Sequence, residues 1–392
     1  MSDEIPFANY QYEIYLRGMT GQRPARSLDW RELERDALNL LRRGPRGYIA
    51  GAAGLGETMR ANREAFDHWR LRPRMLRDVS ERSLARTVLG TEMAAPVLLA
   101  PIGVQTLAHP EGELAMARGA AQAGVPVVAS SAASHTVEEI AGACGDLARW
   151  YQLYWPKDRE LARSFLERAE HAGYSAVVVT LDTWLLGWRP ADLSEGFLPF
   201  LWGEGNRNYL EDPVFRGLLE VAPEEDMQAA VGQWAWQFAN PSVTWEDLAF
   251  LRECTELPIV LKGIVHPDDA RLAVEHGVEG VLVSNHGGRQ VDGAIGALDA
   301  LPGVVEAVDG RCEVLFDSGI RGGADALKAL ALGARAVMLG RPYIWGLALG
   351  GAEGVTEVLR GFLADLDLAM ALSGFANIDE VDASALVAQG KI

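Results

Sequence analysis

The chain has 392 residues, 49% of them hydrophobic and 23% charged, an ordinary balance for a globular protein with a large core. Its net charge of −18 disfavours nucleic acid and anionic membranes, so we expect neither as a partner. A small anionic substrate would therefore need cations supplied locally at its binding site.

The hydrophobic pattern from residue 96 onward predicts eight short strands. The segments are nearly continuous in Val, Leu, Ile and Ala, as expected of strands that are covered on both faces. They alternate with helical patterns, which predicts a TIM (β/α)8 barrel, with an open doubly wound sheet as the alternative. The predicted strands are residues 96–100, 126–129, 149–154, 176–181, 258–261, 280–284, 313–316 and 336–339.

Three of the intervening helices have clear boundaries. Acidic residues mark their first turns and a glycine follows each of them, which is the usual punctuation of a helix. These helices are predicted at about residues 110–124, 267–277 and 323–333.

Two segments lie outside this rhythm. Residues 1–95 are predicted to be an N-terminal helical extension, with a helix near 30–43 and then a Gly/Ala-rich stretch, while the barrel domain covers 96–392. Residues 190–243 separate the fourth strand from its helix, where connections of about 2–6 residues are usual. Because βα connections lie over the catalytic face, we interpret this insertion as a lid whose apolar segment 197–202 excludes water. A small hydrophobic subdomain is the alternative.

The cysteines Cys144, Cys254 and Cys312 are odd in number and widely spaced. This pattern favours buried thiols in a reducing compartment over disulfides, and it predicts no metal cluster. The first ten residues are neither basic nor followed by an apolar run, so we expect a cytoplasmic protein without a secretory signal.

The strongest chemical signal is the segment SNHGGRQ at residues 284–290, directly after the sixth predicted strand. Catalytic residues of barrels lie at the carboxyl ends of strands. His286 is suited to act as a base and Arg289 to bind a carboxylate. A structural histidine is the alternative, but the combination of His, Arg and glycines at this place favours catalysis.

Asp182 and Arg189 follow the fourth predicted strand. A carboxylate there faces the barrel mouth, where it can hydrogen-bond His286 and stabilise the imidazolium. An Asp that caps its own loop is the alternative. Arg189 is a candidate second carboxylate clamp, although an isolated loop arginine is more often solvated.

Two further strands end in polar residues. Strand alternation places Gln152 and Tyr154 on one face, where Gln suits a polar heterocycle and Tyr a substrate oxygen. Lys262 ends the fifth strand, and a lysine is almost never buried without a partner. It is suited to the electron-rich edge of a reduced flavin.

The last two strands end in the Gly/Arg-rich segments 317–323 and 339–342. Backbone N–H groups of such loops, together with Arg321 and Arg341, suit a phosphate monoester. Loops after strands seven and eight are the usual phosphate site of a barrel.

In this order the motifs resemble those of the FMN-dependent α-hydroxy acid oxidase and dehydrogenase family. The resemblance runs from about Tyr48 to Leu372 and implies bound FMN, a small 2-hydroxy acid substrate, O2 as oxidant and a homo-oligomer of four or eight chains. It rests on APIG at 100–103, YQLY at 151–154, TLDT at 180–183, KG at 262–263, SNHGGR at 284–289 and GR at 340–341.

The resemblance also implies roles for individual residues. His286 is the base at the substrate α-carbon, Asp182 supports it, and Tyr154 contacts the substrate oxygen. The implied carboxylate-binding residues are Tyr48, Arg189 and Arg289. The implied FMN contacts are Pro101, Ile102, Ser130, Gln152, Thr180, Lys262, Ser284, Asp317, Gly319, Arg321, Gly340 and Arg341.

Within the family, the chain is most similar to the lactate 2-monooxygenase branch. This likeness rests on the long insertion and on LDTW at 181–184, GWRP at 187–190, NY at 208–209, DPVF at 212–215 and SVTWED at 242–247. It implies that L-lactate is oxidised to pyruvate, which stays bound and is decarboxylated to acetate, carbon dioxide and water. Early release of pyruvate would instead give the oxidase products, pyruvate and hydrogen peroxide.

Three points bear on the alternatives. Ala132 stands where glycolate-oxidising relatives carry a bulky aromatic residue, so the side-chain preference is expected to differ from theirs. A quinone-linked dehydrogenase at a membrane is a rival, which the acidic residues of the insertion oppose. A flavin-binding scaffold without turnover is a rival of another class, and the intact set of Asp182, His286 and Arg289 opposes it.

Overall fold

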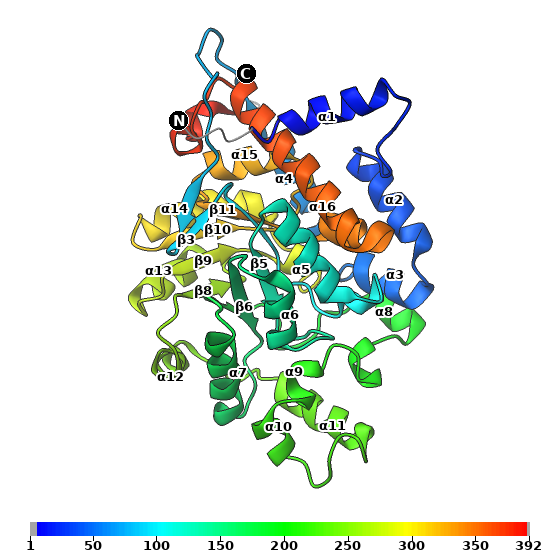
Figure 1. Cartoon of the computed structure of the whole chain (residues 1–392). Helices are drawn as coiled ribbons and strands as arrows, with labels where there is room; N and C mark the ends of the chain where they lie inside the picture. Colours follow the sequence, from blue (N-terminus) through cyan, green and yellow to red (C-terminus); the bar gives the residue numbers. More distant parts are fainter. Residues whose placement is uncertain (1–5, 390–392) are drawn as a thin grey trace.

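The computed structural model describes residues 6–389 and shows eight parallel strands closed into a barrel, with helices around it (Figure 1). The strand order is β10-β11-β4-β5-β6-β7-β8-β9, so the TIM-barrel prediction is confirmed and the open sheet is wrong. Every strand bound lies within one residue of its prediction. The strands are β4 (Val97–Leu99), β5 (Val127–Ser130), β6 (Arg149–Leu153), β7 (Val177–Thr180), β8 (Ile259–Lys262), β9 (Gly280–Val283), β10 (Glu313–Phe316) and β11 (Ala336–Leu339).

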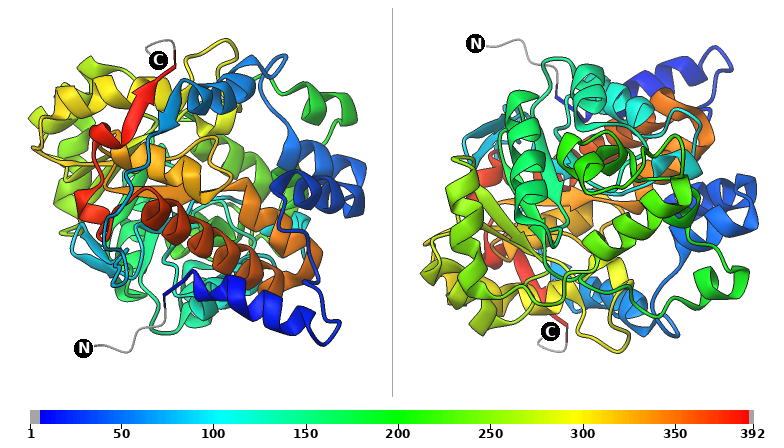
Figure 2. Two further views of the ribbon diagram at one scale, coloured as in Figure 1. Left: turned by 90° about the horizontal axis from the view of Figure 1, so that it is seen from above. Right: turned by 90° about the horizontal axis from the view of Figure 1, so that it is seen from below.

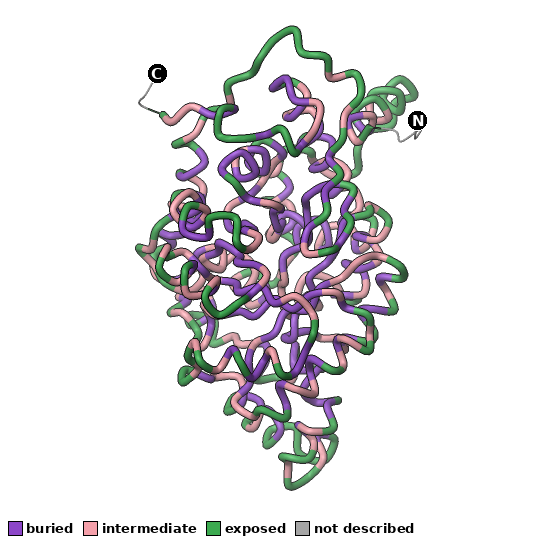
Figure 3. Tube along the Cα trace, turned by 90° about the vertical axis from the view of Figure 1, so that its left-hand side faces the viewer, coloured by how far each residue is buried: buried purple, intermediate pink, exposed green. Residues whose placement is uncertain are grey.

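Side chains rather than a channel fill the barrel. Alternate strand residues point inward, among them Leu98, Val128, Trp150, Val178 and Met338, and all of these are buried. The remaining strand residues face the surrounding helices in a second, larger core. Figure 3 shows buried backbone through the middle of the molecule and exposed segments at its outer turns.

A hairpin of β2 (Arg86–Val88) and β3 (Thr91–Met93) closes the amino end of the barrel. Val88 and Met93 pack against the interior residues, and the Trp150 indole donates a 2.9 Å hydrogen bond to the Thr91 hydroxyl. Beside it, β1 (Trp69–Leu71) pairs with β12 (Leu386–Ala388). The carboxyl ends of the strands are thus the end at which a ligand site can form.

The outer helices follow the βα rhythm. They are α5 (Gly112–Ala123), α6 (Val137–Cys144), α7 (Arg159–His171), α12 (Leu248–Cys254), α13 (Pro267–Glu275), α14 (Ala297–Val308), α15 (Gly323–Ala331) and α16 (Arg341–Leu372). The three helices with predicted boundaries are α5, α13 and α15. The long α16 is kinked at Gly350 and Gly351, which have non-helical backbone angles.

The N-terminal extension contains α1 (Asn9–Gly18), α2 (Trp30–Leu40), α3 (Arg43–Ala50) and α4 (Glu57–Asp67). Residues 1–5 of the predicted extension lie outside the described residues. The helix predicted near 30–43 is confirmed as α2, but it ends three residues earlier than predicted because Leu41 and Arg42 are extended, and a new helix starts at Arg43. Pro45 is tolerated there because the first turn of a helix does not need its N–H. α1 lies alongside α16 (Figures 1 and 2).

The insertion between β7 and α12 folds into α8 (Pro190–Glu195), η2 (Pro199–Trp202), α9 (Arg207–Leu210), α10 (Pro213–Gly217), α11 (Met227–Phe238) and η3 (Trp245–Asp247). Figure 1 shows it in green, with α9, α10 and α11 at the lower end and α8 beside α3. Phe200 is buried and stacks on Trp234, with ring centroids 4.8 Å apart. Trp202 is 75% exposed, so this end of the apolar segment 197–202 faces solvent.

Two smaller findings complete the fold. Cys144 and Cys254 are buried, but Cys312 is half-buried, which corrects the expectation of three buried thiols. Within residues 6–389, no helix is long and apolar enough to cross a membrane.

Candidate active site

A cavity that opens to solvent lies at the carboxyl ends of the strands, the end at which a barrel forms its ligand site. Its walls come from α3, from the loops after the barrel strands and from the insertion. The predicted site residues that line it are Tyr48, Pro101, Ile102, Tyr154, Arg189, Lys262, His286, Arg289, Asp317, Gly319, Arg321, Gly340 and Arg341.

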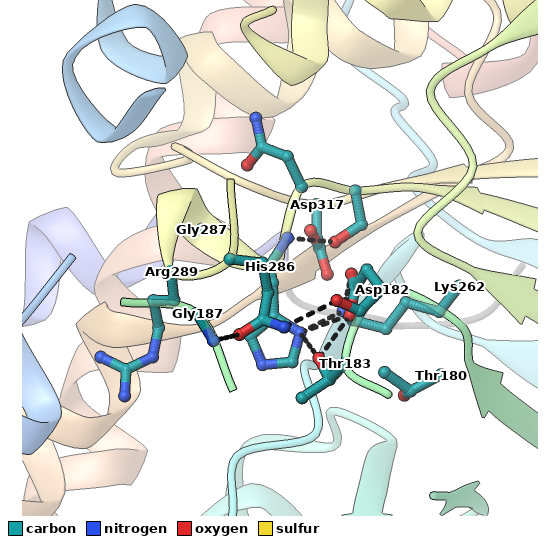
Figure 4. Close-up of polar contacts among 12 residues, drawn as sticks. Thr180, Asp182, Thr183, Gly187, Lys262, His286, Gly287, Arg289 and Asp317 are labelled. Carbon is teal, nitrogen blue, oxygen red and sulfur yellow. Dashed lines mark hydrogen bonds and ion pairs between the residues drawn. The ribbon is translucent and has the colours of Figure 1, made fainter. Parts of the chain in front are cut away.

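His286 lines this cavity and forms a hydrogen-bonded pair with Asp182 (Figure 4). The Asp182 carboxylate lies 2.8 Å from Nδ1 of His286, so Nδ1–H donates to it and Nε2 is left without a proton. The Thr183 hydroxyl donates to the same carboxylate oxygen at 2.7 Å. Lys262 lies 3.1 Å from the other carboxylate oxygen. The imidazole is therefore held in the tautomer that can accept a proton at Nε2.

The surroundings of this pair keep the imidazole neutral. Burial lowers the pKa of His286 to about 4, the Lys262 ammonium lowers it as well, and Asp182 opposes both. Burial alone would raise the pKa of Asp182, but Lys262 and His286 outweigh it and hold that pKa well below its usual range. At neutral pH the pair is a neutral base beside a carboxylate, which can stabilise the imidazolium once a proton arrives.

The backbone at the histidine is unusual. His286 has a φ of 57°, in the left-handed region that few residues with a side chain adopt. Gly288 follows with a φ of 76°, and a Cβ there would come within 2.5 Å of the backbone nitrogen of Met59. The hydroxyl of Ser318 accepts a hydrogen bond from the N–H of Gly287 at 3.1 Å. The glycines of the motif thus permit the turn that aims the imidazole into the cavity.

Arg189 and Arg289 supply positive charge at the cavity wall. Arg189 is 5% exposed, and its guanidinium donates to the carbonyl of Arg289 at 3.0 Å. The guanidinium of Arg289 lies 5.1 Å from the ring centroid of Tyr48, and burial lowers its pKa to about 10. Within residues 6–389, no carboxylate lies within 4.0 Å of either guanidinium. Such a pair is suited to a ligand carboxylate.

Tyr154 lies at the apolar side of the cavity, where its ring packs 4.9 Å from that of Phe238. Burial raises its pKa far above the usual value, with Asp182 and Tyr48 adding to the effect. Its hydroxyl therefore remains a hydrogen-bond donor throughout the physiological pH range.

A second pair of buried arginines in the cavity lining, Arg321 and Arg341, is suited to a phosphate. Burial lowers the pKa of Arg341 to about 9 and that of Arg321 to about 10. Among the described residues, the buried Nε atoms of both have no hydrogen-bond partner. Arg321 also lies between the rings of Trp30 and Trp345, at 5.6 and 5.0 Å. Two buried cations with unpartnered donors match the dianionic phosphate of FMN, so the residues present fit this cofactor.

Four predicted FMN contacts lie behind the cavity lining rather than in it. The Ser130 hydroxyl donates to the side-chain oxygen Oε1 of Gln152 at 2.9 Å, and the side-chain Nε2 of Gln152 donates to the Thr180 hydroxyl at 2.9 Å. Ser284 accepts a 3.1 Å hydrogen bond from the backbone N–H of His286. All four are buried, and Ser130, Gln152 and Thr180 connect the ends of three neighbouring strands.

The structure also adds residues that sequence reasoning missed. Phe238 and Leu186 form an apolar wall of the cavity together with Phe200, which belongs to the predicted lid segment 197–202. Thr183 bonds both Asp182 and His286, and Gln290 bonds the segment that carries Asp182. Thr183 and Gln290 stood within the motifs TLDT and SNHGGRQ, but an amide or hydroxyl next to a catalytic residue does not reveal its partners.

Comparisons with known proteins agree with this site. The profile of the family described as FMN-dependent dehydrogenase matches residues 37–388. The chain is 46% identical over 378 residues to an FMN-dependent alpha-hydroxy acid dehydrogenase of Penicillium citrinum, covering 95% of this chain and 94% of the relative. It is 42% identical to an L-lactate oxidase of Lysinibacillus sphaericus, covering 96% of each. A crystal structure of mandelate oxidase superimposes with a TM-score of 0.82 at 38% identity, covering 93% of this chain and 98% of the other. The chain therefore belongs to the FMN-dependent dehydrogenase family and is an FMN-dependent 2-hydroxy acid oxidoreductase.

Proposed function

We propose that the chain oxidises L-lactate with O2 and keeps pyruvate in the cavity until it is decarboxylated, so that the products are acetate, carbon dioxide and water. The observation that carries the oxidation is a neutral His286 beside two arginines, Arg189 and Arg289, that have no carboxylate of their own among residues 6–389. One cavity thus offers a base and a carboxylate clamp at once.

The residues have distinct tasks in this proposal. Arg289 and Arg189 bind the substrate carboxylate, helped by Tyr48, and the Tyr154 hydroxyl donates to a substrate oxygen. Nε2 of His286 accepts the proton, and Asp182 stabilises the resulting imidazolium. Bound FMN supplies the redox chemistry by accepting two electrons from the substrate and passing them to O2.

A second set of residues would hold the cofactor. Arg321 and Arg341 bind the phosphate, together with the backbone around Gly319 and Gly340. Lys262 and Asp317, with Pro101, Ile102 and the layer of Ser130, Gln152, Thr180 and Ser284, surround the ring system.

The substrate side chain is proposed to be small and apolar. The wall that would face it consists of Ala132, Leu186, Phe200 and Phe238, none of which carries a charge. A methyl group fits such a wall without leaving a polar group unpaired. Relatives named L-lactate oxidase support this choice, whereas the mandelate oxidase structures support a larger substrate.

Product retention is proposed from the way the insertion covers the cavity. α8 packs on α3, and the ring of Phe197 lies directly against Gly44, where a Cβ would come within 2.8 Å of it. Phe200 places its ring on Tyr48, with centroids 6.3 Å apart. Such a cover narrows the exit and slows release, so that pyruvate and peroxide meet before either escapes.

Release of pyruvate and hydrogen peroxide is the second candidate. The L-lactate oxidase of Lysinibacillus sphaericus aligns over 96% of both chains, so the length of the insertion does not separate this chain from an oxidase.

The test is to quantify acetate and hydrogen peroxide after aerobic turnover with L-lactate. Stoichiometric acetate supports the monooxygenase proposal, and stoichiometric peroxide refutes it in favour of the oxidase. Phe200→Ala is expected to shift products from acetate to peroxide because it opens the cover. Trp202→Ala is the matched control, since this side chain belongs to the same segment but is 75% exposed.

We also propose a cytoplasmic homo-oligomer of four or eight chains. Large apolar side chains of α1 support assembly, since Tyr12, Tyr15 and Leu16 are each more than 60% exposed. Light scattering of the FMN-loaded protein tests the assembly, and a monomer would refute it. The three free thiols support a reducing compartment, which fractionation of the native cells tests.

A further inference from the structure

Gln290 joins two catalytic segments that are far apart in the sequence. Its amide nitrogen donates to the carbonyls of Asp182 and Leu185, at 2.7 and 2.9 Å. Its amide oxygen accepts from the Arg189 guanidinium at 2.6 Å and from the Gly187 N–H at 3.3 Å. One side chain therefore holds the segment 182–189 at four points.

The orientation of this amide follows from its partners. The two carbonyls can only accept and the two N–H groups can only donate, so a reversed amide would lose all four bonds. The backbones also touch closely, because a Cβ at Gly187 would lie 2.6 Å from the carbonyl oxygens of Arg289 and Gln290. The segment 182–189 and the segment that carries Gln290 therefore contact each other in one fixed alignment.

The position of the segment 182–189 determines where two pairs of site residues lie. Asp182 supports His286 at one end of the segment 182–189, and Arg189 lies beside Arg289 at the other end. Between them the chain is irregular, with no helix or strand over residues 181–189. A catalytic constellation has to be held within about 0.5 Å, and an irregular loop cannot do this without side-chain support.

We propose that Gln290 is a positioning residue, which holds the segment 182–189 so that the His286–Asp182 pair and the Arg189–Arg289 clamp act on one substrate. The inference rests on the proposed function of this site. Gln290 does not line the cavity, so it acts through Asp182 and Arg189 and does not touch the substrate.

The main test is Gln290→Met, which keeps the length of the side chain and removes all four hydrogen bonds. We expect anaerobic flavin reduction by L-lactate to slow by about 10- to 100-fold, as for lost hydrogen bonds to a charged group. The Kd of pyruvate, measured by flavin difference spectra, should rise by a similar factor. FMN content should stay at the wild-type level, because Arg321 and Arg341 hold the phosphate elsewhere.

A double-mutant cycle with Arg189→Met separates positioning from general packing. If Gln290 acts through Arg189, the effect of Gln290→Met on pyruvate binding disappears in the Arg189→Met background. Gln237→Met is the matched control, since Gln237 is also buried and bonds a backbone N–H, that of Asp158, outside the cavity. Its effect should be small and independent of Arg189.

Wild-type flavin reduction and pyruvate binding in Gln290→Met would overturn the proposal, and so would effects that add with those of Arg189→Met. If Gln290→Met fails to hold FMN, the same cycle is run with Gln290→Glu. That variant keeps the bond to Arg189 but cannot donate to the two carbonyls, so reduction should slow while pyruvate binding falls less. Failure of L-lactate to reduce the wild type would refute the proposed substrate, whereas the pyruvate cycle would still decide the role of Gln290.

Discussion

Replacing Asp182 with Asn isolates the charge that faces His286. The amide has the shape of the carboxylate and can still accept from Nδ1–H, but the negative charge 2.8 Å from the imidazole is lost. Lys262 then stands 3.2 Å from Nδ1 without its carboxylate partner. Both changes disfavour the imidazolium that forms when Nε2 accepts a proton.

The size of the effect follows from the contact. A hydrogen bond to a charged group contributes about 1.5–3 kcal/mol, so flavin reduction should slow by about 10- to 150-fold. The pH dependence has a defined sign. His286 has a pKa of about 4 and must be neutral to act, so kcat/KM for reduction falls as the pH drops through that value. Because Asp182 raises the pKa of His286, its loss moves the acid limb to lower pH.

Stopped-flow measurement of flavin bleaching by L-lactate, without oxygen and over a range of pH, gives both quantities. Unchanged FMN content and far-UV circular dichroism show that the variant is folded. Reduction at the wild-type rate, or an acid limb that moves to higher pH, would show that Asp182 does not stabilise the His286 imidazolium.

The other substitutions test the base and the clamp. His286→Ala should slow flavin reduction by about 10²- to 10⁴-fold while FMN stays bound, and fast reduction of this variant by lactate would contradict its role as the base. Arg289→Met should raise the Kd of pyruvate by a factor that corresponds to about 2–5 kcal/mol. An amide of lactate that reduced the wild-type flavin as fast as lactate would count against a carboxylate clamp at this residue.

The barrel could be predicted from the sequence because each strand is marked by a local feature, a short apolar segment. A buried parallel strand must be apolar on both faces, so each of the eight strands is visible as a segment of four to six residues. The Gly/Arg loops and the SNHGGRQ motif were readable for the same reason, since barrel topology places every strand end at one rim. In the structure 13 of the predicted site residues line one cavity.

What the sequence did not predict depends on contacts between distant segments. Arg189 reads as an ordinary loop arginine, but it is buried because the carbonyl of Arg289 and the amide of Gln290 accept from it. Phe200 and Trp202 have similar character and opposite exposures, which only the packing against Tyr48 and Trp234 decides. These partners lie tens of residues away in the sequence, and a periodic pattern within one helix or strand does not predict contacts at such a separation.

The distribution of charge leads to a last prediction, on stability. The chain carries −18, but its cavity contains Arg321 and Arg341, whose pKa values burial lowers to about 10 and about 9. Within the part of the chain that the structure describes, neither forms an ion pair with a carboxylate within 4.0 Å. Folding therefore has to desolvate two cations, and a bound phosphate offsets that cost.

FMN at about 100 times its Kd should stabilise the fold by about 2.7 kcal/mol. Arg341→Gln should weaken FMN binding by about 10- to 100-fold, as for a lost charge-assisted hydrogen bond, yet raise the melting temperature of the FMN-free protein. Thermal unfolding with and without FMN measures both effects. If the FMN-free variant melted below the FMN-free wild type, Arg341 would be part of the structural framework, and the phosphate would have to be held mainly by Arg321 and the glycine-rich backbone.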